Sequence, residues 1–306
     1  MHGLVMHGRA YDSLARSLAQ QGFIVVATDM RGYGRCGQDC DHAFCEKPDC
    51  RQKIDYEKSY RDLLKLSEQM KGKYPGMPVI GLGESLGAAM AIRLSSEHSG
   101  LFDGLILSSP AIKHHTFVHP RNVATTGIVI ANPRAQLDLM PYMKRFASDD
   151  PRIISELEND PLVRKHLSIY ELLQSSGAVR KTMSYVRGIL PSVPVLVIQG
   201  SADRCVKANA VVLLLSHLRS SDQTVKWFHQ RGHILLETAY IKPDTMDAVV
   251  SWLKEHVNPQ EIQARQGPDY ISSQEDGTDR HYPGKDISLF SRQLPSLRVI
   301  LTGGAL

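Results

Sequence analysis

The sequence contains no run of about 18 apolar residues, the length that a helix needs to cross a bilayer. Its first residues, Met-His-Gly-Leu, also lack the basic stretch and apolar segment that mark a secretory signal peptide. These absences argue against a membrane-spanning helix and predict, by default, a cytoplasmic protein. A true start further upstream would hide such a signal.

A strong charge of either sign is also missing. The formal net charge is +4 over 306 residues, and lysine and arginine are not gathered into a stripe. No nucleic-acid partner is therefore expected. The 42% of hydrophobic and 22% of charged residues are ordinary for a globular chain. The length allows one large domain, or a core domain that carries an insertion.

Cysteine is scarce and unevenly placed. Four of the five cysteines lie between positions 36 and 50 with the spacing C-x3-C-x4-C-x4-C, which lacks the paired C-x2-C arms of structural zinc sites. We interpret Cys36, Cys40, Cys45 and Cys50 as free thiols in a surface loop. A pair of disulfides or a metal clip is the alternative.

Short, continuous apolar runs alternate with amphipathic segments along most of the chain. This alternation is typical of an α/β fold, with a mostly parallel sheet covered by helices on both faces. The predicted strands are residues 23–27, 79–82, 104–110, 194–200 and 224–228, and the predicted helices are 11–21, 55–73, 86–93, 208–218 and 239–256.

The alternation stops twice, which divides the chain. Residues 111–190 show helical or irregular patterns without a clear strand, as expected for a cap over the carboxyl ends of the strands, where open α/β sheets bind ligands. The core is then 1–110 and 191–258. Residues 259–306 are polar and punctuated by Gly and Pro, which predicts a disordered or loosely attached tail. Its apolar stretch 297–301 is interpreted as an added strand.

The strongest motif is Gly-Glu-Ser-Leu-Gly at residues 83–87, between an apolar strand and a helix rich in alanine. In such a strand–turn–helix setting a serine is held in a strained backbone conformation and becomes a nucleophile. Side chains at Gly83 and Gly87 would collide with the neighbouring strand and helix. Ser85 is therefore the candidate nucleophile.

A serine nucleophile needs a base, and the base needs an orienting acid. In this fold class the chain order is Ser, then Asp or Glu, then His, each just after a strand. Asp203 and His233 follow the predicted strands 194–200 and 224–228 in that order. His233 follows a glycine and precedes the apolar run 234–236, as a loop residue at a helix start would. The alternatives are Asp203 as a helix N-cap and His233 as a satisfied loop residue.

Other histidines and acids fit the pattern less well. His229 lies in or beside its strand, and Asp222 precedes the strand, on the wrong edge of the sheet. The histidines of the cap are interpreted as solvated; they are His114, His115, His119 and His166.

Two backbone N–H donors are needed for the oxyanion. Leu86 follows the nucleophile and starts a helix, whose dipole favours negative charge. Leu4 follows His2-Gly3 and is the second candidate donor, although His2-Gly3 can also be read as a frayed start.

At this point the sequence resembles the monoacylglycerol lipase / lysophospholipase-like branch of the α/β-hydrolases, sometimes grouped with the serine aminopeptidases. The resemblance covers about residues 1–257. It is carried by His2-Gly3, Tyr11 with Leu14-Ala15, Asp29-x-Arg31-Gly32-Tyr33-Gly34, Tyr74-Pro75, the 83–87 motif, Asp160-Pro161, Gln199-Gly200-Ser201-Ala202-Asp203 and Gly232-His233.

The resemblance implies a Ser85–His233–Asp203 triad, oxyanion donors at Leu4 and Leu86, a helical cap, and ester hydrolysis without a metal or other cofactor. Two departures stand out. Members of the branch carry strands before the His-Gly motif, including a central one, so N-terminal strands are expected to be missing here. Cys36 stands where the branch has serine.

The expected function is cleavage of carboxylic esters of small molecules or lipids, with at most transient contact between the cap and a membrane surface. Ile128, Leu139 and Met143 are the candidate acyl-binding residues of an apolar set that could equally pack the cap's own core. The alternatives are a small-acyl esterase, a peptidase, and a non-hydrolytic or truncated inactive protein. Acids that could bind a substrate amine, or be mere surface charges, are Glu84, Glu156, Glu158 and Glu237.

Overall fold

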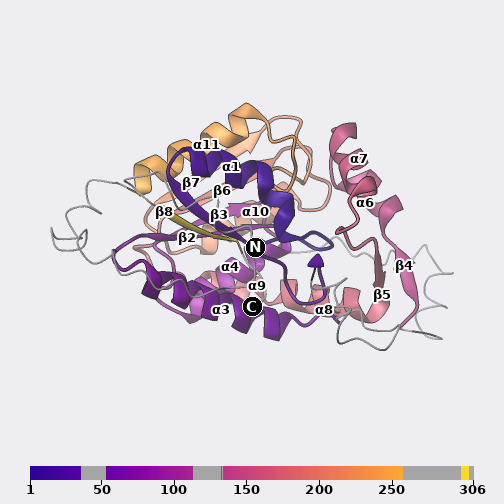
Figure 1. The fold of residues 1–306 in the computed structure, drawn as a ribbon, viewed down its shortest axis with the longest axis horizontal. Coiled ribbons are helices and arrows are strands. Elements are labelled where there is room, and N and C mark those ends of the chain that lie inside the picture. The colour runs from indigo at the N-terminus through magenta and orange to yellow at the C-terminus, as the bar shows by residue number, and fades with distance from the viewer. Residues whose placement is uncertain (36–52, 113–131, 133, 258–297, 303–306) are drawn as a thin grey trace, which may run out of the picture.

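A computed structural model describes residues 1–35, 53–112, 132, 134–257 and 298–302. Its centre is a sheet of six parallel strands in the order β1-β8-β2-β3-β6-β7 (Figure 1). The strands are β1 (Phe23–Ala27), β2 (Val79–Glu84), β3 (Gly104–Ser108), β6 (Val195–Gly200), β7 (Gln223–Phe228) and β8 (Arg298–Thr302). The expected parallel α/β fold is confirmed.

The apolar runs account for the central strands. Every residue of β2, β3 and β6 is buried, as expected for strands that are covered on both faces. β7, at the edge, is exposed at several positions. Because all six strands are parallel, their carboxyl ends lie at one edge of the sheet, and the loops that follow β2, β6 and β7 meet there.

Helices cover both faces of the sheet. Figure 1 shows α1 and α11 on one face and α3, α4 and α9 on the other. Their bounds are α1 (Asp12–Gln20), α3 (Tyr56–Lys73), α4 (Leu86–Glu97), α9 (Thr182–Val186), α10 (Ala208–His217) and α11 (Pro243–His256), and a 3-10 helix, η1, spans Gly8–Tyr11. Nine of the twelve residues of α4 are buried, so the helix after Ser85 is a core element.

One predicted helix boundary was wrong. The helix expected from residue 239 begins only at Pro243. Proline fits the first turn of a helix, where its missing N–H is not needed, and it restricts the residue before it to an extended backbone. Lys242 accordingly has φ −75° and ψ 147°.

The tail contributes a strand to the middle of the sheet. β8 pairs with β1 along its whole length and with β2 from Val299 to Leu301, so the added strand expected at 297–301 is present. A missing central strand would leave the ladder groups of its neighbours unpaired. In the structure β8 pairs with those groups of β1 and β2. The other residues of the predicted tail lie outside the described part of the chain.

The described part of the predicted cap contains β4 (Gln136–Asp138), β5 (His166–Ser168), α6 (Met140–Phe146), α7 (Pro151–Asn159) and α8 (Ile169–Arg180). β4 and β5 form an antiparallel pair, so the expectation of no strand here was wrong. Three-residue strands are too short for a period of two to be recognised.

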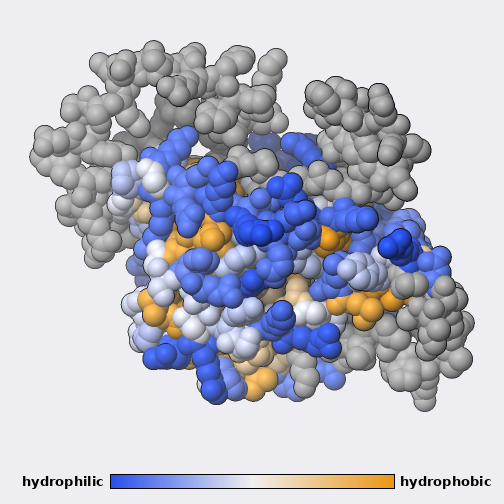
Figure 2. Space-filling model, turned by 90° about the horizontal axis from the view of Figure 1, so that it is seen from below, coloured by the Kyte–Doolittle hydropathy of each residue, from blue (hydrophilic) through white to orange (hydrophobic). Residues whose placement is uncertain are grey.

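No helix of the described residues has both the length and the apolar character to cross a membrane. The face seen in Figure 2 is mostly hydrophilic, with separate apolar patches. Cys36, Cys40, Cys45 and Cys50 lie outside the described residues.

Candidate active site

Ser85 sits in a strained turn between β2 and α4. Its φ of 54° and ψ of −114° are unfavourable for any residue with a side chain. The conformation is fixed by the backbone: Ser85 N–H donates to Ser108 O over 2.9 Å, and Ser85 O accepts from Ala111 N over 3.1 Å. A Cβ at Gly83 would lie 2.4 Å from the backbone of Gly87. The turn therefore requires glycine there, as the motif predicted.

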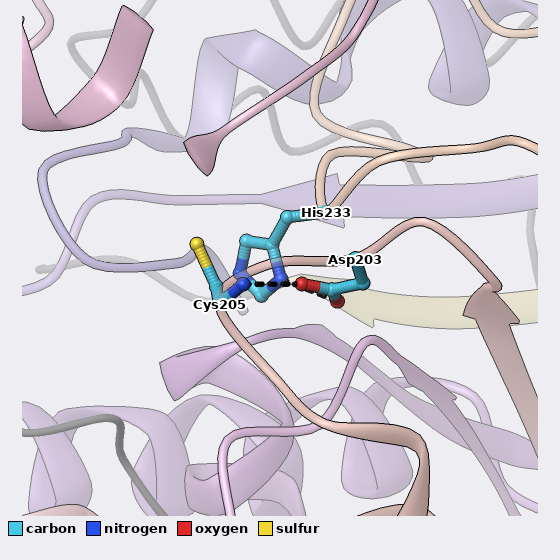
Figure 3. A group of neighbouring side chains, drawn as sticks. All are labelled: Asp203, Cys205 and His233. Atoms are coloured by element: carbon cyan, nitrogen blue, oxygen red, sulfur yellow. Dashed lines mark hydrogen bonds and ion pairs between the residues drawn. The ribbon is translucent and has the colours of Figure 1, made fainter. Parts of the chain in front are cut away.

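Asp203 and His233 form a buried pair. Asp203 Oδ2 lies 2.8 Å from His233 Nδ1, and the Asp203 and His233 side chains are 1% and 11% exposed. Figure 3 shows the imidazole ring directed at the carboxylate. Gln199 Nε2 also donates to Oδ2, over 2.7 Å. The Asp203 carboxylate is thereby aimed at the ring.

The other oxygen of Asp203 holds its own loop. Oδ1 accepts the N–H of Cys205 at 2.7 Å and of Val206 at 2.9 Å. Asp203 is not the N-cap of the following helix, because Lys207 occupies that position. The loop after β6 is thus built around the carboxylate that faces His233.

The pKa values of Asp203 and His233 shift in opposite directions. Burial alone would raise the pKa of Asp203, but His233 and the hydrogen bonds to the carboxylate bring it below its ordinary value. Burial opposes the charged form of His233, but Asp203, and to a smaller extent Glu84, raise the pKa of the imidazole above its ordinary value. This pairing stabilises an imidazolium, the form that a general base takes during catalysis.

The backbone of His233 is fixed on both sides. Its N–H donates to Ala147 O at the end of α6 over 3.1 Å, and its carbonyl accepts from Ser109 Oγ over 2.7 Å. The expected helix start just after His233 is not present, since Ile234 to Leu236 lie buried in a loop.

Ser85 and His233 line the same cavity. Among the described residues no hydrogen bond joins their side chains, and such bonds often tighten only when substrate binds.

Two free N–H groups point to a site for an oxyanion. Leu86 is the first residue of α4, so its N–H has no partner within the helix. Leu4 lies in a turn closed by Met6 N–H donating to Gly3 O over 3.3 Å. Among the described residues, neither Leu4 N nor Leu86 N donates to another group. Both residues line the cavity beside Ser85.

The cavity itself is mainly apolar and is lined both by loops at the carboxyl ends of the strands and by residues of α6, α7 and α8 in the predicted cap. Leu139 and Met143 line it, while Ile128 lies outside the described residues. Several lining residues were not singled out from the sequence, because they come from separate segments; they are Val5, Met6, Tyr142, Ala147, Leu157, Ser175, Val179, Cys205, Val206 and Ile234. These residues line the cavity because the fold brings their segments together, and no local sequence pattern marks them.

The competing residues lie elsewhere. His229 and His166 are exposed, and His114, His115 and His119 lie outside the described residues. Asp222 is 3.0 Å from His256 Nε2, at the other end of β7. None of the described competitors lines the cavity.

The four acids considered for an amine pocket differ from one another. Glu84 is fully buried and Glu237 is 3% exposed, so neither is a surface charge. Glu156 Oε1 accepts from Ala239 N at 3.0 Å, and Glu158 pairs with Lys144 at 2.5 Å. Of the four, only Glu237 lines the cavity.

Asp203, Cys205 and His233 are residue types that commonly bind metal ions, and they lie close together. Ligating atoms of Asp203, Cys205 and His233 lie within 4.8 Å of one another in the described chain. Burial and the nearby Asp203 raise the pKa of the Cys205 thiol to about 12, and metals bind the thiolate. Figure 3 shows the sulfur directed away from the Asp203–His233 pair. The chemistry of this group suits a hydrogen-bonded pair better than a metal centre.

Comparison with known proteins gives a consistent result. A family profile described as serine aminopeptidase, S33, matches residues 1–238. The chain is similar to monoglyceride lipase of Homo sapiens, with 31% identity over 242 residues that cover 76% of this chain and 74% of the human protein. It is also similar to monoacylglycerol lipase of Mycolicibacterium smegmatis, with 25% identity over 256 residues that cover 84% and 87% of the two chains.

Solved structures show the same fold. A monoacylglycerol lipase of Paleococcus ferrophilus matches with a TM-score of 0.65 and 22% identity, over 84% of this chain and 93% of that one. A soluble variant of monoglyceride lipase from Saccharomyces cerevisiae, in complex with a substrate analogue, matches with a TM-score of 0.66 and 18% identity, over 84% and 85% of the chains. At these identities the likeness shows the α/β-hydrolase fold alone.

Proposed function

The chain belongs to the serine aminopeptidase S33 family of hydrolases, and from this we propose that it is a serine hydrolase that cleaves carboxylic esters, with monoacylglycerols or lysophospholipids as the substrate class. One observation carries the proposal. Ser85, in a strained turn, lines the same apolar cavity as His233, and His233 is paired with a buried Asp203. Relatives named monoglyceride lipase support the substrate class.

Each residue has a role in the proposed reaction. His233 Nε2 takes the proton of Ser85 as the hydroxyl attacks the ester carbonyl, and then gives it to the leaving alcohol. The Asp203 carboxylate holds the Nδ1–H tautomer and stabilises the imidazolium. A water activated by His233 then releases the acyl group from Ser85.

The developing oxyanion would be held by the N–H groups of Leu4 and Leu86. Loss of one such donor typically slows a reaction by about 100- to 1000-fold. The apolar wall, which includes Leu139 and Met143, would take the acyl chain.

A peptidase acting on N-terminal residues is less well supported. Such an enzyme needs a free carboxylate for the substrate amine. Glu237 is the one considered acid in the cavity wall, and its Oε1 already accepts the N–H of Gly3 over 2.6 Å. Burial and the neighbouring Glu84 raise the pKa of Glu237 well above its ordinary value, which disfavours the charged carboxylate that would pair with a substrate amine.

The test is hydrolysis of p-nitrophenyl esters from acetyl to dodecanoyl by the wild type and by Ser85→Ala. We expect turnover that depends on Ser85 and peaks at medium or long chains. Ser184→Ala is a matched control, because Ser184 lies in α9 and is exposed; it should leave turnover unchanged. A peak at acetyl would favour the small-acyl esterase, and a folded protein without Ser85-dependent turnover would contradict the proposal.

A further inference from the structure

Glu84, the residue between Gly83 and the candidate nucleophile, makes a set of contacts that the proposed reaction does not use. Its Oε1 accepts the N–H of Leu235 at 2.9 Å and of Leu236 at 3.2 Å, and its Oε2 accepts the N–H of Leu236 at 3.2 Å and of Glu237 at 2.9 Å. The hydroxyl of Ser108 donates to Oε1 as well. One buried carboxylate thus receives three successive backbone N–H groups and a hydroxyl.

These contacts define the charge of Glu84. Burial raises the pKa of this carboxyl, while the hydrogen bonds from Ser108, Leu235 and Glu237, together with His233, act against that rise. Every group that contacts the carboxylate is a donor, and a protonated acid would need an acceptor. We therefore assign the negative charge to Glu84.

Glu237 continues the connection to a third loop. Its main-chain N–H donates to Glu84, and its own Oε1 accepts the N–H of Gly3 over 2.6 Å. Gly3 directly precedes Leu4, the candidate oxyanion donor. The two acids therefore join the turn of Ser85, the loop of His233 and the turn of Leu4.

The loop that carries His233 needs such an anchor. Residues 234–237 are buried but belong to no helix or strand, so their N–H groups have no partners from regular structure. A buried N–H without an acceptor is unfavourable. Three of these residues bond to one side chain that is covalently adjacent to Ser85, so the distance between base and nucleophile depends on that side chain.

On the premise of the proposed serine-hydrolase function, we propose that Glu84 is a positioning residue: it holds the loop of His233 over Ser85, and through Glu237 it also holds the turn of Leu4. It does not touch the reacting atoms. Its second effect is electrostatic, because a fixed negative charge near the imidazole stabilises the imidazolium.

The charged and titratable groups around this arrangement are few among the described residues. His233 is faced by Asp203 from the loop after β6 and by Glu84 from β2. Glu84 is faced by His233 and Glu237, and the amino group of Met1 and the hydroxyl of Tyr11 interact with both acids. Loss of the charge at Glu84 must therefore lower the pKa of His233 while Asp203 remains in place.

The experiment compares Glu84→Gln and Glu84→Asp with Glu158→Gln, a control at an exposed acid of the cap. All are made in a Ser85→Ala background, so that the first two measurements need no activity. Hydrogen exchange of residues 235–237 should become at least about tenfold faster in both Glu84 variants, because the N–H groups of these three residues lose their acceptor. The pKa of His233, followed by NMR of its imidazole, should fall by about half a unit or more in Glu84→Gln.

Glu84→Asp keeps the charge but shortens the side chain, so it separates position from charge. We expect faster exchange with a smaller change in the pKa of His233. It also serves if Glu84→Gln does not fold. With Ser85 restored, both variants should lower kcat for the p-nitrophenyl esters by about 10- to 100-fold. We expect KM to stay within about threefold, because Leu139 and Met143, which are proposed to take the acyl chain, lie outside the loop and the turn that Glu84 holds.

Each result has a defined meaning. Unchanged exchange of residues 235–237, or an unchanged pKa of His233 in Glu84→Gln, would overturn the positioning role even if the wild type is an active esterase. A kcat equal to that of the control would do the same. A wild type without Ser85-dependent turnover would contradict the proposed function, while the exchange and NMR results would still decide the contacts of Glu84.

Discussion

The N–H of Arg164, in the cap, donates to the carbonyl of Val5, in the turn that carries Leu4, over 2.9 Å. A second contact reinforces the first, since Asp160 Oδ2 lies 3.0 Å from His7 Nε2. Val5 has a φ of +66°, a conformation that is rare for a β-branched residue and costs about 1–3 kcal/mol. These contacts from residues 160–164 therefore help to keep the candidate oxyanion turn in an unfavourable conformation.

We predict that Asp160→Ala lowers kcat about tenfold, because the turn relaxes and the N–H of Leu4 moves away from the oxyanion. Glycine adopts a positive φ without strain. In a Val5→Gly background the same substitution should therefore cost less than about threefold. The measurement is kcat for a p-nitrophenyl ester in all four combinations of the two substitutions.

Asp150→Ala provides the control for this cycle. Asp150 is also in the cap and caps α7 through the N–H of Arg152. Asp150→Ala should change kcat by the same factor in the wild type and in the Val5→Gly background. If Asp160→Ala lowered kcat by the same factor in the wild type and in the Val5→Gly background, the contact of Asp160 would not act through the turn.

The Asp203–His233 pair predicts the pH dependence of activity. A general base must be neutral, and the pKa of His233 is raised above its ordinary value of 6.5. Activity should therefore rise with pH, with the midpoint of the acid limb of kcat/KM above about 6.5. Asp203→Asn removes the charge and the acceptor for Nδ1–H, so we expect kcat to fall by about 10⁴-fold, the loss seen for such a change in a Ser-His-Asp triad.

The same variant gives the sign of the pH shift. Without the carboxylate the imidazolium is less stable, so the residual activity should have its acid limb at lower pH than the wild type. The profile is measured from about pH 5 to 9 in a constant-ionic-strength buffer. A wild-type midpoint well below 6.5, or a shift to higher pH in Asp203→Asn, would contradict the assignment of His233 as the base.

Replacement by alanine should change the free energy of unfolding in opposite directions at Gly87 and at Gly72. A Cβ at Gly87 would lie 1.9 Å from Met1 O, whereas a Cβ at Gly72 in α3 meets nothing within 4 Å. Gly87→Ala should lower the free energy of unfolding by more than about 2 kcal/mol through overpacking. Gly72→Ala should raise it by up to about 1 kcal/mol, because alanine favours the helix. Urea unfolding of both variants measures the difference, and equal values would contradict this packing.

The sequence allowed the candidate triad to be predicted because its information is local. Ser85, Asp203 and His233 each follow a short apolar run, and parallel strands bring their carboxyl ends to one edge of the sheet. The two glycines of the 83–87 motif carry the steric requirement directly. These signals do not depend on knowing which distant segments touch.

The burial of Glu84 and Glu237 could not be predicted, because it depends on contacts between distant segments of the chain. Glu84 is buried because donors from residues 235–237 surround it, about 150 positions away in the chain. A glutamate beside the nucleophile looks like a surface charge until those donors are known. The loop of Ile234 to Leu236 could not be distinguished from a helix start either, because a buried loop and a helix start have the same apolar pattern.

The last prediction concerns β8. Ile300 pairs with Val25 on one side and with Ile80 on the other, so its backbone lies in the interior of the sheet. Proline has no N–H and is tolerated only at the edge of a sheet or at bulges. Ile300→Pro should therefore lower the free energy of unfolding by more than about 2 kcal/mol beyond the effect of Ile300→Ala, which keeps the backbone donor.

Urea unfolding of the two variants isolates the contribution of the backbone, because both lose the isoleucine side chain. Esterase activity should fall with stability in Ile300→Pro, since β2 ends one residue before Ser85 and pairs with β8. If proline and alanine at this position gave equal stability and activity, β8 would not be the strand that separates β1 from β2, and another segment would have to pair with those two strands.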